Sequence, residues 1–192
     1  MTLGRLGRLG IGFGLALSLH GCLAPRGWQG PPPPADEDRL DFAAAEPWFI
    51  VVRTACRTLD VYRQGDRIRS YHAVFGLGGA SGKEFEGDRR TPTGLYAIAA
   101  VRQHERWRRF LLLDYPNQRD WRRYDAALAN GTVPMLGSRP VGVGGAVGIH
   151  GTDKPRLNRM NVDWTWGCIS LDNADVVELA NLVPVGTPVL IE

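Results

Sequence analysis

Short apolar runs rich in β-branched residues, separated by glycine and proline, are the feature that most constrains how this chain can fold. The chain has 24 glycines and 13 prolines among its 192 residues. Short β-branched runs between turn residues are typical of strands. We expect strands in residues 49–62, after the turn RQGD at 63–66, from residue 95, and in residues 108–116, 139–151 and 189–192. The pattern predicts a mainly β fold, a sandwich or partial barrel.

Two segments have a helical pattern instead. Residues 117–131 form an amphipathic sequence that ends at Asn130-Gly131. Residues 169–183 place apolar side chains at helical spacing after Asp172, which is a candidate N-cap, and the sequence PVGTP ends that segment. We therefore expect two short helices beside the strands.

The N-terminus has the features of an export signal. Arg5 and Arg8 precede the apolar run of residues 9–19, which is too short to span a bilayer as a helix. The following sequence LHGC, residues 19–22, resembles a bacterial lipobox, in which the signal is cut before a cysteine that then receives lipid. This predicts a signal peptide over residues 1–22, with Cys22 as a lipid anchor to a membrane. An ordinary signal peptide with an incidental cysteine is the alternative.

Residues 23–46 contain four consecutive prolines and no apolar periodicity, so we expect an extended spacer. The remaining residues, 47–192, have the length of one domain with one core. An exported protein with such a spacer would work in the periplasm or cell envelope.

Two basic segments, residues 101–109 and 118–123, contain interleaved tryptophans, a composition that also occurs in nucleic-acid-binding proteins. The formal net charge is only +3. A solvated basic face is the simpler interpretation for an exported protein, and an acidic cell-wall polymer is a better partner than nucleic acid. We expect no nucleic-acid partner.

The cysteines point to one reactive thiol. If Cys22 is acylated, only Cys56 and Cys168 remain, and pairing them would consume the thiol that could do chemistry. We expect Cys56 to be a small structural residue in the strand-like run 49–62. Gly167 precedes Cys168 and allows a sharp turn, and His150 ends a glycine-rich run with seventeen residues between it and Cys168.

A cysteine and a histidine in this arrangement favour nucleophilic catalysis, because a thiolate needs a base and its oxyanion needs preorganised N–H donors. A zinc site formed by His150, Asp163 and Cys168 is the alternative, but the sequence lacks a Cys-x-x-Cys pair or a second nearby histidine. We expect no metal and no cofactor. Trp164 and Trp166 either line a groove or pack against the turn before Cys168.

Several ordered motifs in residues 47–192 resemble the catalytic domain of the L,D-transpeptidases of bacterial cell walls. They are His150-Gly151-Thr152, Thr165-Trp166-Gly167-Cys168-Ile169, GDRRTPTGLYAI at 87–98, DYPNQRD at 114–120 and the ending VPVGTPVLIE. The resemblance implies that Cys168 is the nucleophile and His150 its base. It implies further that the backbone at Gly167 and Cys168 forms the oxyanion hole, with Thr165 beside it.

The resemblance also implies a peptidoglycan stem peptide with diaminopimelate as the substrate, bound by Gly151, Thr152, Trp166 and Ser170. Many members have arginine at the position of Ser170, and a serine cannot replace the charge of a guanidinium. Arg156 and Arg159, between His150 and Cys168, are candidates to supply that charge, or they are simply solvated.

The chain most resembles the branch that lacks this arginine, which includes a hydrolase of the bond between Braun's lipoprotein and peptidoglycan. We therefore expect a cysteine acyltransferase or hydrolase acting on the L-centre of diaminopimelate, with hydrolysis favoured and a peptidoglycan-linked lipoprotein as a further substrate. The alternatives are a cross-linking L,D-transpeptidase that makes 3-3 links, and a catalytically retired peptidoglycan-binding lipoprotein.

Overall fold

The computed structural model describes residues 46–192. The predicted signal over residues 1–22, with Cys22, and the predicted linker as far as residue 45 lie outside the described residues. Within the described part, no helix is long and apolar enough to cross a membrane.

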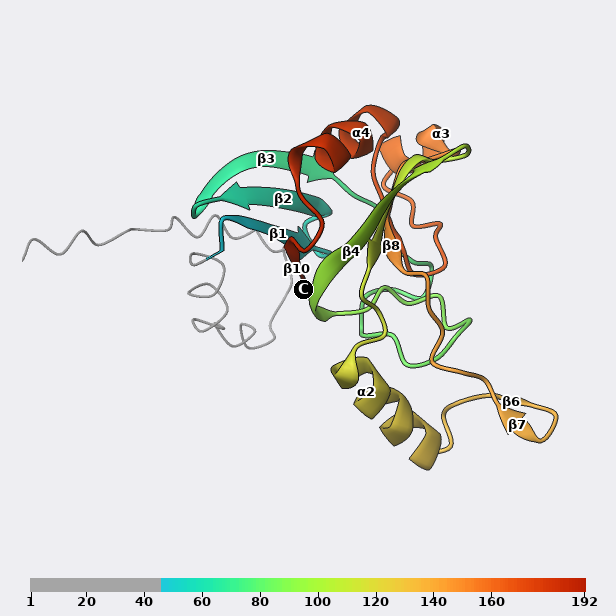
Figure 1. Cartoon of the computed structure of the whole chain (residues 1–192). Coiled ribbons are helices and arrows are strands. Elements are labelled where there is room, and N and C mark those ends of the chain that lie inside the picture. The colour runs from blue at the N-terminus through green and yellow to red at the C-terminus, as the bar shows by residue number, and fades with distance from the viewer. Residues whose placement is uncertain (1–45) are drawn as a thin grey trace, which may run out of the picture. The chain divides into compact units, whose positions relative to one another are not determined.

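Ten strands and three helices make up the described residues, which confirms the mainly β class (Figure 1). The strands are β1 (Trp48–Arg53), β2 (Thr58–Arg63), β3 (Asp66–His72), β4 (Gly94–His104), β5 (Arg108–Leu113), β6 (Met135–Leu136), β7 (Arg139–Pro140), β8 (Gly148–His150), β9 (Ile169–Ser170) and β10 (Pro188–Ile191). The helices are α2 (Gln118–Ala129), α3 (Pro155–Arg159) and α4 (Asn173–Leu182).

Eight strands form one mixed sheet in the order β3-β2-β1-β10-β4-β5-β8-β9. The pairs β1·β10 and β8·β9 are parallel, and the other pairs are antiparallel. The long strand β4 belongs to both halves, since its start pairs with β10 and its remainder with β5, with a register irregularity after Ile98. Bridges from Val74 to Ser170 and from Gly76 to Thr165 join the chain after β3 to the far end of the sheet, as in a partial barrel.

Helices α2 and α4 hold the chain on either side of the segment that carries His150 and Cys168. Asn117 caps α2 with a reciprocal capping box to Asp120, and the Tyr124 hydroxyl donates to the Val141 carbonyl at 2.8 Å. This contact ties the chain leading into β8 to α2. Helix α4 packs against β5 and β8 and buries Val176 and Leu179. Asp172 occupies the N-cap position, as the sequence indicates, but its side chain makes no capping hydrogen bond.

Three details differ from the sequence-based expectations. Residues 49–62 are two strands and not one, because the chain reverses at Thr54–Arg57, where Arg57 has a φ of 55°. Cys56 therefore lies half-buried in a turn and not in a strand. The glycine-rich run 139–151 contains only the short strands β7 and β8. The third helix, α3, has five residues, which is too short to give a helical period in the sequence.

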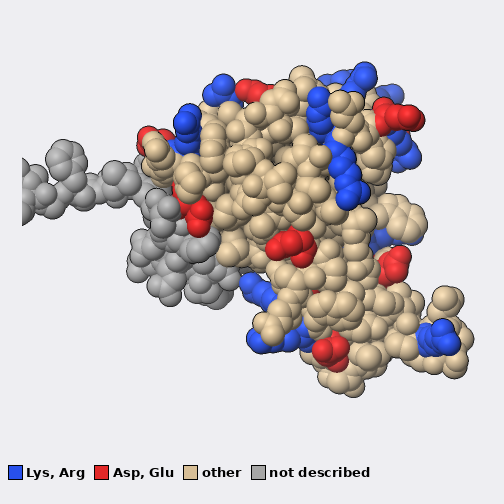
Figure 2. Space-filling view, viewed as in Figure 1, with Lys and Arg blue, Asp and Glu red and all other residues tan. Residues whose placement is uncertain are grey.

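Charged side chains of both signs occur over the surface. Figure 2 shows basic and acidic groups interspersed on one face, including a basic group on the projecting β6–β7 hairpin.

Candidate active site

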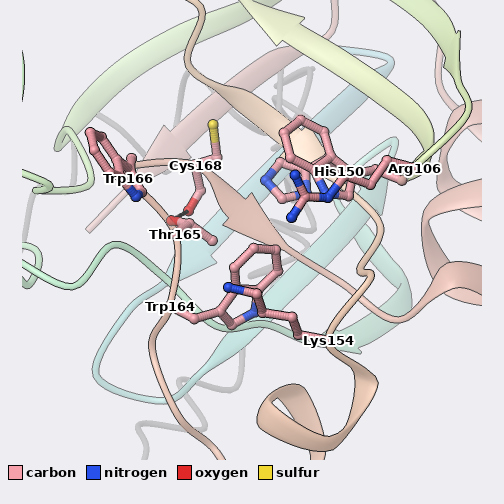
Figure 3. Close-up of a pocket in the computed structure, with 8 residues that line it drawn as sticks. Arg106, His150, Lys154, Trp164, Thr165, Trp166 and Cys168 are labelled. Carbon is pink, nitrogen blue, oxygen red and sulfur yellow. Dashed lines mark hydrogen bonds between the residues drawn. The ribbon is translucent and has the colours of Figure 1, made fainter.

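Adjacent parallel strands bring the candidate nucleophile and base together. His150 ends β8 and pairs in register with Ser170 of β9, two residues after Cys168. His150 and Cys168 both line one pocket, shown in Figure 3. Its other lining residues are Arg106, Trp107, Lys154, Trp164, Thr165 and Trp166.

The turn before Cys168 is fixed by its own polar contacts. The Thr165 hydroxyl donates to the Cys168 carbonyl at 2.7 Å and accepts from the Gly167 N–H at 3.2 Å. Gly167 has a φ of 124°, and a Cβ there would lie 2.7 Å from the Arg90 carbonyl oxygen. Only glycine fits this position, so the sequence presents the thiol on a rigid turn.

In the described part of the chain, the thiol of Cys168 has a hydrogen-bond partner, whereas its backbone N–H does not. Cys168 Sγ lies 3.7 Å from the Ala146 carbonyl, and Ala146 adopts a φ of 53°. Among the described residues, Cys168 N–H has no protein acceptor, whereas Gly167 N–H is already engaged by Thr165. The N–H of Cys168 is therefore the donor that remains available for an oxyanion.

The protonation of His150 follows from its hydrogen bond. Its Nδ1 lies 2.6 Å from the Gly151 carbonyl oxygen, and a carbonyl can only accept. The proton must be on Nδ1, which leaves the lone pair of Nε2 free to take a proton. Gly151 thus supplies the third group that orients the base, and the sequence did not identify it.

Aromatic rings enclose His150, which is only 1% exposed. Trp107 stacks on the imidazole with ring centroids 4.2 Å apart and an interplanar angle of 20°. Phe110 is nearly parallel to it at 5.9 Å, and Trp164 meets it edge-on at 5.8 Å. His104 stacks on Trp107 at 4.4 Å. The turn between β4 and β5 therefore covers one face of the imidazole and shields that face from water, while His150 still lines the pocket.

Burial sets the charge state of both candidate residues. It lowers the pKa of His150 to about 4, although the bond to Gly151 acts in the opposite direction. Burial also raises the pKa of the Cys168 thiol, while a backbone hydrogen bond from Gly148 and the positive charge of Lys83 oppose that rise. At neutral pH the resting pair is a neutral thiol and a neutral imidazole.

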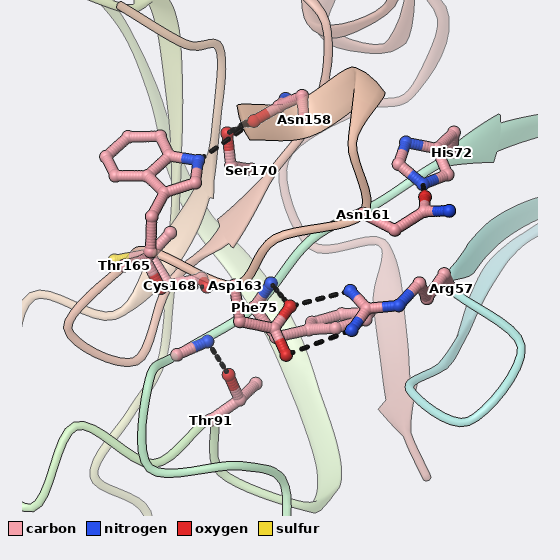
Figure 4. A network of polar contacts seen from close by, with 12 residues as sticks. Arg57, His72, Phe75, Thr91, Asn158, Asn161, Asp163, Thr165, Cys168 and Ser170 are labelled. Atoms are coloured by element: carbon pink, nitrogen blue, oxygen red, sulfur yellow. Dashed lines mark hydrogen bonds and ion pairs between the residues drawn. The ribbon is translucent and has the colours of Figure 1, made fainter. Parts of the chain in front are cut away.

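A buried polar chain connects the base to the wall of the pocket, and Figure 4 shows its central members, Asn158 and Ser170. The Trp164 indole N–H donates to Asn158 Oδ1 at 2.9 Å, and the Asn158 amide donates to Ser170 Oγ at 3.3 Å. Ser170, 0% exposed, lies 3.4 Å from the Gly151 carbonyl that orients His150. Ser170 thus contacts the interior and lines no part of the pocket.

Asp163 has a structural role. It accepts two hydrogen bonds from Arg57, at 2.7 and 3.2 Å, and one from the Phe75 N–H at 2.9 Å (Figure 4). These contacts hold the segment that leads to Trp164. Within residues 46–192, no group of three His, Cys, Asp or Glu side chains could hold a metal ion.

A buried ion pair beneath the nucleophile turn had no recognised signal in the sequence. Lys83 Nζ lies 2.6 Å from Asp88 Oδ1, and both side chains are nearly inaccessible. Asp88 also accepts from the backbone N–H groups of Glu84 and Arg90. Lys83 Nζ is 3.9 Å from the position of a Cβ on Gly167, so its charge lies next to the Gly167–Cys168 backbone.

The remaining predicted substrate-binding residues separate into two groups. Gly151 and Thr152 are buried behind the pocket, where the Thr152 N–H donates to Asn173 Oδ1 at 2.9 Å. Trp166 is 70% exposed at the pocket wall, and the Arg89 guanidinium lies over its ring at 5.0 Å.

The cations of the pocket are not those considered from the sequence. Arg156 and Arg159 lie exposed on α3 and do not line it. Arg106 and Lys154 line it instead (Figure 3). Arg106 belongs to a basic segment that the sequence suggested was simply solvated.

A family model described as the L,D-transpeptidase catalytic domain matches residues 46–191. No curated protein sequence matches the chain.

Solved structures share the fold at low identity. An L,D-transpeptidase from Xylanimonas cellulosilytica has a TM-score of 0.50 at 18% identity, over 77% of this chain and 61% of that one. Bdellovibrio bacteriovorus Bd1075 has a TM-score of 0.52 at 21% identity, over 77% of this chain and 48% of that one. The helical cell shape determining protein Pgp2 from Campylobacter jejuni has a TM-score of 0.54 at 21% identity, over 76% and 47%. The match thus spans less than two thirds of each of these proteins.

Proposed function

The chain belongs to the L,D-transpeptidase catalytic domain family, and from that premise we propose that it is a cysteine enzyme acting on peptidoglycan stem peptides. Cys168 attacks the carbonyl on the L-centre of diaminopimelate and forms a thioester, which mainly water resolves. The observation that carries this proposal is the shared pocket of Cys168 and His150, in which the imidazole keeps a free Nε2 lone pair.

The first half-reaction forms the acyl-enzyme. His150 Nε2 takes the thiol proton as Cys168 Sγ bonds to the carbonyl carbon, and the carbonyl oxygen becomes an oxyanion that the Cys168 N–H can stabilise. The C–N bond then breaks, the protonated imidazole gives its proton to the leaving amine, and a thioester remains. A neutral thiol and a neutral imidazole in the resting enzyme suit this order of steps, because the proton moves only as the S–C bond forms.

The second half-reaction releases the acyl group. His150 takes a proton from water as the water oxygen attacks the thioester carbon. The S–C bond breaks, the carboxylic acid leaves, and the sulfur regains a proton from His150. A cross-linking enzyme would use the amine of a second stem peptide in place of water.

The make-up of the pocket supports hydrolysis over transfer. A transferase must hold an acceptor amine long enough to compete with water, which requires a second docking surface. Helix α2 is a candidate for such a cap on sequence grounds, but none of its residues lines the pocket. Ser170 is buried and offers an acceptor no contact there.

Product analysis tests the proposal. Purified protein incubated with disaccharide tetrapeptides should give mainly the corresponding tripeptides and few 3-3 cross-linked dimers. Muropeptides with a lysine-containing peptide joined to diaminopimelate should release that peptide. Abundant 3-3 dimers with little free tripeptide would make the protein a transpeptidase, and complete inertness toward all of these compounds would favour a binding lipoprotein.

We also propose that the protein is exported and attached to a membrane through lipid on Cys22, on the basis of the charged N-terminus, the apolar run and LHGC. Cys22→Ser should then move the protein from the membrane fraction to the soluble fraction of the envelope. Mass spectrometry of the mature protein checks the modification itself. Recovery of Cys22 as a free thiol or in a disulfide would contradict it.

A further inference from the structure

Two cations flank the catalytic pocket, each held over an aromatic ring that contacts His150 (Figure 3). The Arg106 guanidinium carbon is 5.7 Å from the ring centroid of Trp107, which stacks on His150. Lys154 Nζ is 4.8 Å from the ring centroid of Trp164, which meets His150 edge-on. The positive groups are thus fixed relative to the reacting centre by cation–π contacts.

The two cations differ in whether their charge is already compensated. Arg106 forms an ion pair with Asp153, with Nε 2.6 Å from Oδ2, so that pair is close to neutral. Lys154 has no carboxylate of residues 46–192 within 4.0 Å of its ammonium. These three groups leave the pocket rim with one net positive charge, which belongs to Lys154.

The backbone around Lys154 is well fixed. Its N–H donates to the Thr152 hydroxyl at 2.8 Å, and Pro155 follows it as the first residue of α3. Trp164, under the ammonium, is held by its own hydrogen bond to Asn158. A charge placed in this way needs little reordering to meet an anion, which favours binding.

We infer that Lys154 binds a free carboxylate of the acyl donor, specifically the carboxylate on the D-centre of diaminopimelate. The inference rests on the proposed function. Cys168 attacks the carbonyl on the L-centre of diaminopimelate, and the side chain of the same residue ends in the D-centre with its free carboxylate. The L-centre and the D-centre must therefore both be accommodated around one pocket. Arg106 neutralises Asp153, which would otherwise repel the same anion.

The test compares Lys154→Met, which keeps an unbranched apolar chain against Trp164, with Lys154→Arg, which keeps the charge. The probes are disaccharide tetrapeptides whose D-centre carboxyl is either free or amidated. Lys154→Met should raise KM for the free acid about tenfold, with a smaller change in kcat, and should leave the amidated substrate unaffected. Lys154→Arg should retain most of the preference for the free acid, and added salt should reduce it.

A matched control removes the same charge elsewhere. Arg67 lies on β3 outside the pocket, and Arg67→Met should leave KM for both substrates unchanged. A third substrate, amidated only on the leaving residue, distinguishes the alternative carboxylate. If the rise in KM of Lys154→Met disappears with this third substrate, and not with the one amidated on the D-centre, Lys154 binds the carboxylate of the leaving residue and the inference is overturned.

Binding to Cys168→Ala separates this inference from the proposed function. Calorimetry should show that this inactive variant binds the free-acid tetrapeptide about tenfold more tightly than the amidated one, and that adding Lys154→Met removes the difference. This result would support the carboxylate site even if the wild-type protein turned over neither substrate. Equal binding of the two peptides, or binding of neither, would overturn it.

Discussion

Trp107 stacks on the imidazole of His150 with ring centroids 4.2 Å apart, and this contact connects the β4–β5 turn to the catalytic base. The charged or titratable groups nearby are His104, on Trp107, the ion-paired Arg106 and Asp153, and Lys154 and Cys168 of the same pocket. Burial is the largest cause of the lowered pKa of His150, and the stacked indole contributes to it by shielding one face of the imidazole from water.

Replacing Trp107 with alanine should raise the pKa of His150 from about 4 toward its usual value of 6.5. The acidic limb of the pH profile of kcat/KM reports this pKa in the free enzyme. For the wild type we expect that limb below pH ~5 and for Trp107→Ala near pH ~6. Trp107→Phe, which retains a stacked ring, should shift it less. Superimposable acidic limbs for wild type and Trp107→Ala would show that the indole does not control the base.

The low pKa of His150 also predicts how stability depends on pH. The unfolded chain binds a proton at His150 near pH 6.5, whereas the folded protein binds one only near pH 4. This contribution to the free energy of unfolding is complete above pH ~6.5 and is lost as the pH falls through ~4, by about 3 kcal/mol in all. Urea unfolding at several pH values should show this loss in the wild type and a smaller one in His150→Gln. Equal losses in both proteins would contradict the assignment.

Gly167→Ala should impair both folding and activity. Its Cβ would lie 2.7 Å from the Arg90 carbonyl oxygen, at a φ of 124° that L-residues rarely adopt. We expect a loss of about 1 kcal/mol or more in the free energy of unfolding. The resulting displacement of Cys168 should lower kcat about 100-fold. Gly65→Ala, at a positive φ with nothing within 4 Å of the new Cβ, is the control for backbone strain alone. If both variants retain full kcat, the rigid turn is not needed for catalysis.

Features with a local signal could be predicted from the sequence. Most of the longer strands, helices α2 and α4, and the approach of His150 to Cys168 follow from apolar spacing, cap residues and short motifs. Helix α3 lacks enough residues for a period. Trp107 contacts His150, Arg106 pairs with Asp153, and Lys83 lies beside the Gly167 backbone. Each of these contacts joins segments distant in sequence, so no local pattern indicates them. Arg156 and Arg159 lie in the expected segment but do not line the pocket, because α3 places them at the surface.

The assignment of roles to the cysteines and to the base can be separated by substitution. Cys168→Ala and His150→Ala should each abolish turnover, because one removes the nucleophile and the other its proton acceptor. Cys56→Ala should retain turnover per folded molecule, since Cys56 lies in the β1–β2 turn and not in the pocket. Loss of turnover in Cys56→Ala with an unchanged circular dichroism spectrum would show that a second cysteine takes part.

The central claim, that Cys168 forms a thioester with the stem peptide, is tested most directly by intact-protein mass spectrometry. Protein mixed briefly with a disaccharide tetrapeptide and quenched in acid should gain the mass of the substrate less its leaving amino acid. Peptide mapping should place the added mass on Cys168, and Cys168→Ala should show none. Release of tripeptide by a protein that acquires no adduct at any quench time, or an adduct that persists in Cys168→Ala, would contradict the account.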